Sequence, residues 1–125
     1  MDRKMAKEFL HLREWLRRAG EIVESGRDRC DSDELLQEAG DSLMMKIGAA
    51  ANRLSRVGVV APKGVEWNSA IGNRNWLIHQ YDEINRELTW LTLSRDLPEW
   101  KRSLEGYFAV AEVALGDGGE SPPKG

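Results

Sequence analysis

The chain has 125 residues and a mass of 14.1 kDa, the size of one domain that can bury its own hydrophobic core. Hydrophobic residues make up 41% and charged residues 31%, which argues against a disordered chain, and no uncharged run approaches the roughly 20 residues of a membrane span. The lone Cys30 can form neither an internal disulfide nor a structural zinc site. With a charged N-terminus that does not resemble a secretory signal, these features predict a cytoplasmic protein.

Charge is distributed unevenly although the net charge is only −3. Residues 1–20 carry a net charge of +3, residues 21–45 carry −6, and residues 46–80 carry +4. The small net charge argues against a general polyanion binder. A basic segment between acidic flanks is commonly no more than solvated helix faces, so it becomes informative only if the same segment holds reactive side chains.

Two long amphipathic helices are expected in the first half of the chain. The first ends near Gly26, and the second continues to Gly58 after a capping box formed by Asp31 and Glu34. Small residues at 48–51 would let another backbone approach the second helix closely. The apolar positions behind these predictions are Met5, Phe9, Leu12, Leu16, Ala19 and Val23, then Leu36, Ala39, Leu43, Ile47, Ala50, Leu54 and Val57.

The second half of the chain predicts shorter helices. A loop at 58–64, which contains Pro62, precedes a third helix. Asn85 is a good N-cap for a short helix that ends near Asp96, and Pro98 suits the first turn of a last helix. The stripe of the third helix is Trp67, Ile71, Ile78 and Tyr81, interrupted by Arg74, and that of the last helix is Trp100, Leu104, Tyr107, Phe108, Ala111 and Leu115.

Together these elements predict an all-α fold, an antiparallel up-and-down helical bundle of four main helices plus one short helix. The bundle domain would span residues 1–115. Residues 116–125, rich in glycine, serine and proline, would form a disordered tail. The tryptophans Trp67, Trp90 and Trp100 are better explained as core anchors than as platforms for stacking bases.

A metal centre is not expected. Glu8 and His11 have the Glu-x-x-His spacing of di-metal helical bundles, but no second copy exists, and His79 has no suitably placed glutamate. His11 should therefore lie exposed on the first helix. The chain also lacks the spacings of a Gly-rich phosphate loop or a nucleophile elbow, and no cofactor is predicted.

The segment from Gly72 to Tyr81 is polar where a core helix would be apolar. Arg74 carries a permanent cation whose fork suits phosphate oxygens, and the ordinary pKa of His79 suits proton transfer near neutrality. Asn75 lies four residues before His79 on one helix face, where its amide could orient the imidazole or a phosphate. These side chains suffice for metal-independent RNA cleavage, in which the substrate's own 2′-hydroxyl is the nucleophile.

The spacing of Arg74 and His79 adds a condition. Five residues separate their directions by about 140° on a regular helix, so one copy would surround a phosphate poorly. Two copies related by a twofold axis would place two arginines and two histidines around a shared cleft, which predicts a homodimer with the site at its interface. The alternative is structural: Arg74 pairs with a carboxylate, and His79 caps or packs against a neighbour.

The pattern Arg74, four residues, His79, one residue, Tyr81 resembles the signature of the HEPN superfamily. In particular it is similar to the small bacterial HEPN toxins (HepT-like) encoded beside a minimal nucleotidyltransferase antitoxin. The Ile-Gly-Ala-Ala run at 47–50 matches a family Ile-Gly-Glu-Ala-like run, and the resemblance covers about residues 5–105. The chain departs from the family pattern at Ala49, Gln80 and Asp82.

The resemblance implies a homodimeric helical fold and a metal-independent endoribonuclease. It also implies a toxin, of a type II-like or type VII-like toxin–antitoxin system, that the cognate nucleotidyltransferase holds in check. Tyr81 would be the adenylylated residue, and an AMP group there would add bulk and negative charge where an RNA phosphate must sit. The alternative is a HEPN domain without catalytic activity that binds nucleotide or acts as a protein partner of a nucleotidyltransferase. A plain helical scaffold would require the motif to be coincidence.

Overall fold

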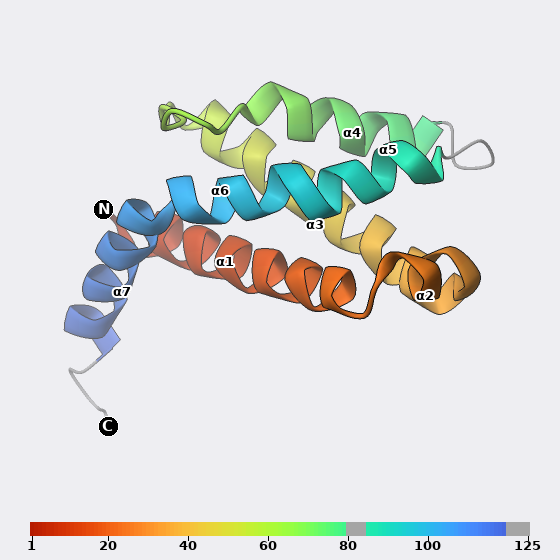
Figure 1. Ribbon diagram of the computed structural model, residues 1–125. Helices are drawn as coiled ribbons and strands as arrows, with labels where there is room; N and C mark the ends of the chain where they lie inside the picture. Colours follow the sequence, from red (N-terminus) through yellow and green to blue (C-terminus); the bar gives the residue numbers. More distant parts are fainter. Residues whose placement is uncertain (80–84, 120–125) are drawn as a thin grey trace.

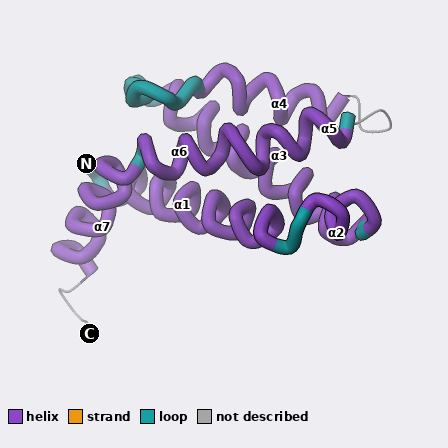
Figure 2. Tube along the Cα trace, in the orientation of Figure 1, coloured by secondary structure: helices purple, strands orange, loops and turns teal. Residues whose placement is uncertain are grey.

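The computed structural model of the protein describes residues 1–79 and 85–119, with side chains for all of these except 75–79 and 117–119 (Figure 1). Every regular element in this part of the chain is a helix, which confirms the all-α fold class (Figure 2). In chain order the elements are α1 (Arg3–Glu24), α2 (Arg27–Ser32), α3 (Glu34–Arg56), α4 (Trp67–His79), α5 (Arg86–Leu91), the π-helical turn η2 (Thr92–Asp96), α6 (Leu97–Ser103) and α7 (Glu105–Gly119).

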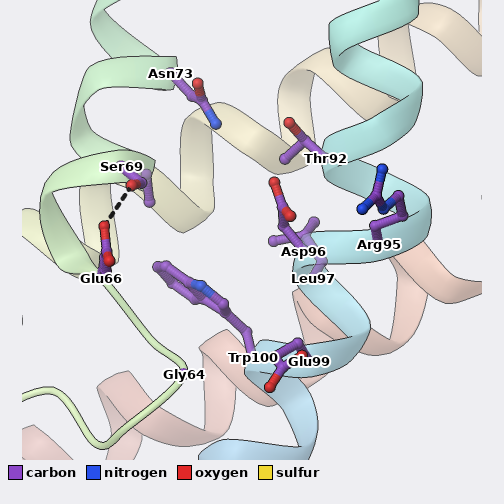
Figure 3. A pocket seen from close by; sticks show the side chains of 11 residues that line it. Gly64, Glu66, Ser69, Asn73, Thr92, Arg95, Asp96, Leu97, Glu99 and Trp100 are labelled. Atoms are coloured by element: carbon purple, nitrogen blue, oxygen red, sulfur yellow. Dashed lines mark hydrogen bonds between the residues drawn. The ribbon is translucent and has the colours of Figure 1, made fainter.

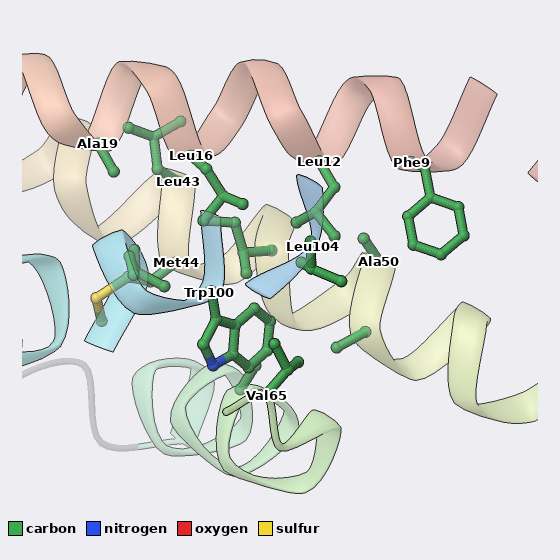
Figure 4. Close-up of a cluster of buried hydrophobic side chains, with 14 of the residues drawn as sticks. Phe9, Leu12, Leu16, Ala19, Leu43, Met44, Ala50, Val65, Trp100 and Leu104 are labelled. Carbon is green, nitrogen blue, oxygen red and sulfur yellow. The ribbon is translucent and has the colours of Figure 1, made fainter. Parts of the chain in front are cut away.

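The helix α1 lies at the centre of the core and packs against α3, α6 and α7. Its buried face follows the predicted period of three and four, and Figure 4 shows this face meeting side chains of α3 and α6. At the N-terminal end the ring of Phe9 stacks on Tyr107 at 4.9 Å and meets Phe108 edge-on at 6.5 Å. The buried residues of α1 are Ala6, Phe9, Leu12, Leu16, Ala19 and Ile22.

The start of α3 differs from the sequence prediction. Asp33, and not Asp31, is the N-cap, because its carboxylate accepts hydrogen bonds from the backbone N–H groups of Leu35 and Leu36. Asp31 instead belongs to α2, a six-residue helix that the sequence analysis missed. The predicted apolar face of α3 is correct in its middle, whereas Ala39 and Val57 at its edges are exposed.

The later helices also divide differently. The short helix begins at the predicted cap, since the Asn85 side chain accepts from two backbone N–H groups of α5. The chain then continues through η2 into α6 without a break, because Asp96 and Leu97 keep helical dihedral angles. Pro98 lacks an N–H group, and a π-helical turn just before it accommodates that loss. The break comes at Leu104 (φ −94°, ψ 1°), where α7 turns away (Figure 1).

The C-terminal helix is longer than predicted. A disordered tail was expected from residue 116, whereas α7 continues to Gly119, and residues 120–125 lie outside the described part. Two of the three tryptophan anchors are buried: Trp67 and Trp100 are 7% and 6% exposed, and their rings meet edge-on at 5.6 Å. Trp90 is partly buried against the same core.

Candidate functional site

The predicted site lies on α4, which packs along α3. Gly48 of α3 makes this packing close: a Cβ built on Gly48 would lie 2.6 Å from the carbonyl oxygen of Ala70 and 2.5 Å from the Cβ of Arg74. The prediction that small residues in α3 admit another backbone is therefore confirmed at this position. Arg74 packs against α3 at Gly48, so the close packing of α3 and α4 fixes the position of this arginine.

The residue Arg74 is half-buried, and no carboxylate of a described residue lies within ion-pair distance of its guanidinium. The structural alternative, an arginine neutralised by a neighbouring carboxylate, is thus not found in the described part of the chain. Arg53, which lies on α3, shows the contrast: Glu8 accepts two hydrogen bonds from its guanidinium at 2.6 and 2.8 Å, and this contact raises the pKa of Arg53.

The other motif residues are placed only in part. Asn75 and His79 lie on α4 together with Arg74, and His79 is the last residue of that helix. Arg74 and His79 are therefore about 7.5 Å apart along one regular helix. The side chains of Asn75 and His79 lie outside the described part, and so does the whole of Tyr81.

Two ion pairs hold the first turn of α5, the helix that follows α4 in the chain. Arg86 donates two hydrogen bonds of 2.9 Å to Asp41 of α3, whose side chain is only 5% exposed. Arg27 of α2 pairs with Glu87 and lowers the pKa of that carboxyl. The sequence analysis missed the buried pair. Its signal was an aspartate beside the apolar stripe of α3, because a carboxylate is rarely buried without a partner.

Two cavities separate α4 from α5, η2 and α6. One, of about 370 Å³, is lined by residues of α4, η2 and α6, including Asn73, Asp96 and Trp100 (Figure 3). The other, of about 270 Å³, is lined by Gly72 and Asn73 together with residues of α5. Asn73 reaches both cavities, whereas Arg74, next in the chain, lines neither.

Glu8 and His11, the candidate metal ligands of α1, do not form a metal site with other described residues. Glu8 binds Arg53, and His11 is exposed, as predicted, beside the ring of Trp15 at 5.8 Å. Within residues 1–79 and 85–119, no three His, Cys, Asp or Glu side chains come together in a group that could hold a metal ion. Over the same residues, no helix is long and apolar enough to cross a bilayer.

Comparison with known proteins identifies the family. Residues 12–106 match the model of one protein family, described as ribonuclease HepT-like. The match includes α2 to α6, most of α1 and every residue of the predicted motif. Neither the curated proteins nor the solved structures give a match to this chain. Because the family match extends over 95 of the 125 residues, the chain belongs to the ribonuclease HepT-like family.

Proposed function

We propose that this chain is a metal-independent endoribonuclease toxin of a toxin–antitoxin system, with a composite site formed by Arg74 and His79 of two copies. The observation that carries the proposal is the family match, which extends across the motif. The placement of Arg74 and His79 on one helix supports it. So does the guanidinium of Arg74, which pairs with no described carboxylate.

The chemistry needs a proton acceptor, a proton donor and a cation at the phosphate. The imidazole of one copy's His79 takes the proton of the RNA 2′-hydroxyl, whose oxygen attacks phosphorus while the bond to the 5′-oxygen breaks. The imidazolium of the other copy's His79 gives its proton to the departing 5′-oxygen. The two Arg74 guanidinium groups stabilise the charge on the phosphate, and Asn75 orients the imidazole or the phosphate.

The experiment is an RNA cleavage assay with purified protein and its variants. Arg74→Ala and His79→Ala should each lower the cleavage rate by about 10² to 10⁴, because each removes the charge clamp or the proton carrier. Arg53→Ala is the matched control, since it removes an arginine whose partner is Glu8, and it should leave the rate unchanged. Circular dichroism should show the same helicity for all of these proteins.

The metal-independent mechanism has a separate test. Cleavage should continue at full rate in excess chelator, because the proposed groups are all side chains of the protein. Loss of activity in chelator, restored by added metal, would contradict this mechanism. If the purified protein binds RNA or nucleotide but cleaves nothing under any condition, the alternative of an inactive HEPN domain that serves as a binding partner is correct instead.

We propose further that a cognate nucleotidyltransferase antitoxin inhibits the toxin in the cytoplasm by adenylylating Tyr81. Each AMP group would add about one negative charge beside the phosphate site, and Arg74 could pair with that phosphate instead of with RNA. Co-expression with the neighbouring nucleotidyltransferase gene should therefore increase the mass of the wild-type chain by one AMP group and leave Tyr81→Phe unchanged. An unmodified Tyr81 in a fully inhibited complex would show that the partner blocks the site by binding alone.

A further inference from the structure

Asp41 is a buried carboxylate to which the proposed mechanism gives no role. It is 4% exposed, and among the described residues no other side chain that is charged at neutral pH is buried. Arg86 of α5 donates a hydrogen bond of 2.9 Å to each of its carboxylate oxygens. A bidentate pair of this kind fixes direction as well as distance. Because an apolar pair of similar volume is often just as stable, stability alone does not account for two charges at this point.

The Asp41–Arg86 pair lies where α3 passes the end of α4. Asp41 is about two helical turns before Gly48, on the same side of α3, and Gly48 is the point at which Arg74 packs. The two helices run in opposite directions (Figure 1), so the step of about 10 Å back to Asp41 leads toward the C-terminal end of α4. His79 is the last residue of that helix. Residues of α3, α4 and α5 line one cavity of about 270 Å³, so the three helices meet in this region.

The chain from Arg74 to Arg86 is attached to α3 at both ends. At the first end Arg74 packs at Gly48, and at the second Arg86 binds Asp41. His79 lies between these points in the chain. Loss of the second attachment would let the start of α5 move away from α3, and the end of α4 would lose a restraint on its C-terminal side. Arg74 would keep its position, because its contact at Gly48 does not involve α5.

We propose that Asp41 and Arg86 are positioning residues of the ribonuclease, an inference that rests on the proposed function. Neither side chain touches the RNA. Their pair holds the end of α4, so that His79 keeps the place relative to Arg74 that proton transfer requires, and a displacement of about 1 Å can cost up to about 10² in rate. Loss of the pair should therefore lower kcat and leave KM unchanged, since Arg74 still binds the phosphate.

Amide hydrogen exchange and RNA cleavage by Arg86→Ala test the proposal, under conditions in which circular dichroism shows the variant to be folded. The amides of residues 75–79 should exchange about tenfold faster than in the wild type. The value of kcat should fall about 10- to 100-fold at an unchanged KM.

Two controls accompany this variant. Arg27→Ala is the matched control, because it releases the exposed pair of the next residue, Glu87, and it should change neither the exchange at residues 75–79 nor kcat. Phe108→Ala removes a buried ring of α7 and is the control for lost stability. It should leave kcat unchanged, because α7 packs against α1 and α6.

A double variant keeps the proposal testable if Arg86→Ala does not fold. Asp41→Leu combined with Arg86→Met replaces the pair by apolar side chains, which should restore the stability. Apolar contacts do not fix a direction, so kcat should stay about tenfold or more below the wild-type value. Wild-type kcat in the double variant, or unchanged exchange at its residues 75–79, would overturn the proposal. A wild-type chain that cleaves no RNA would instead contradict the proposed function, while the exchange, which needs no activity, still decides whether the pair holds the end of α4.

Discussion

The tertiary structure leaves no room for a side chain at Gly48. A Cβ at this position would lie 2.6 Å from the backbone carbonyl oxygen of Ala70 on α4. This oxygen cannot move away unless the helix α4 moves with it. Arg74 lies against the same point. The position of Arg74, the residue proposed to bind the RNA phosphate, therefore depends on the absence of a side chain at Gly48 of α3.

Replacement of this glycine should weaken both the fold and the activity. Gly48→Ala should lower the free energy of unfolding by about 1–3 kcal/mol, because α3 and α4 must separate to admit the methyl group. RNA cleavage should fall as well, since Arg74 is displaced. Urea denaturation and the cleavage assay measure the two effects.

Gly20 of α1 provides the matched control. A Cβ at Gly20 would have no atom within 4 Å, and alanine is the better helix former, so Gly20→Ala should stabilise the protein by about 0.5–1 kcal/mol. If Gly48→Ala is as stable and as active as the wild type, the close approach of α3 and α4 is not required.

At the scale of elements, the first turn of α5 is held from two sides. The Asp41–Arg86 pair is largely buried, whereas both partners of the Arg27–Glu87 pair are about half exposed. Water screens an exposed pair but cannot replace a lost partner around a buried carboxylate. The two pairs should therefore contribute unequally, although they hold adjacent residues of one helix.

Arg86→Ala tests this difference. It should lower the free energy of unfolding by about 3 kcal/mol, near the lower limit for a broken buried pair, because Arg86 itself is about one-third exposed. Arg27→Ala should leave the urea midpoint nearly unchanged at pH 7. Equal losses in the two variants would show that burial of Asp41 does not govern the strength of its pair.

The exposed pair should also respond to acid in a defined direction. Arg27 lowers the pKa of Glu87 below its ordinary value of 4.5, so the pair contributes its stability above pH 4.5. That contribution is lost as the pH falls through the lowered pKa, because the carboxyl then takes up a proton. Urea denaturation at pH 7 and below pH 4.5 should accordingly show a smaller loss of unfolding free energy on acidification in Arg27→Ala than in the wild type.

For the whole molecule, the spacing of Arg74 and His79 predicts a homodimer. Light scattering at micromolar concentration should give about twice the chain mass of 14.1 kDa. The composite site makes a sharper prediction. An excess of the inactive double variant Arg74→Ala, His79→Ala, mixed with the wild type until subunits exchange, should suppress most of the wild-type activity, because a mixed dimer keeps only one arginine and one histidine at the shared cleft.

Two outcomes would contradict the composite site. A monomer at micromolar concentration would remove it, because one copy offers a single arginine and a single histidine, whose directions a regular helix separates by about 140°. A mixed dimer that keeps half of the wild-type activity would show that the Arg74 and His79 of one chain act together without the other copy. Light scattering on the mixture confirms that subunits have exchanged before activity is measured.

The sequence alone determined those features that depend on neighbours along the chain. The apolar period of α1 and α3, the Asn85 cap and the loop around Pro62 were all predicted, because helix periodicity, capping and proline restrictions operate over a few residues. Arg74, Asn75 and His79 were also placed on their helix, and the family match agrees with the resemblance. Boundaries at Asp33 and Leu104 were missed, since α2 and the π-helical turn are weak local signals.

Only the tertiary structure decided which distant residues meet. No local pattern predicts that Gly48 lies against Arg74, that Asp41 pairs with Arg86, or that Phe9 stacks on Tyr107. These relations arise from the packing of helices that are 20 or more residues apart in the chain, and packing follows the shapes of whole surfaces. The sequence therefore supplied the chemistry of the proposed site, while the fold supplied its support and the cavity beside it.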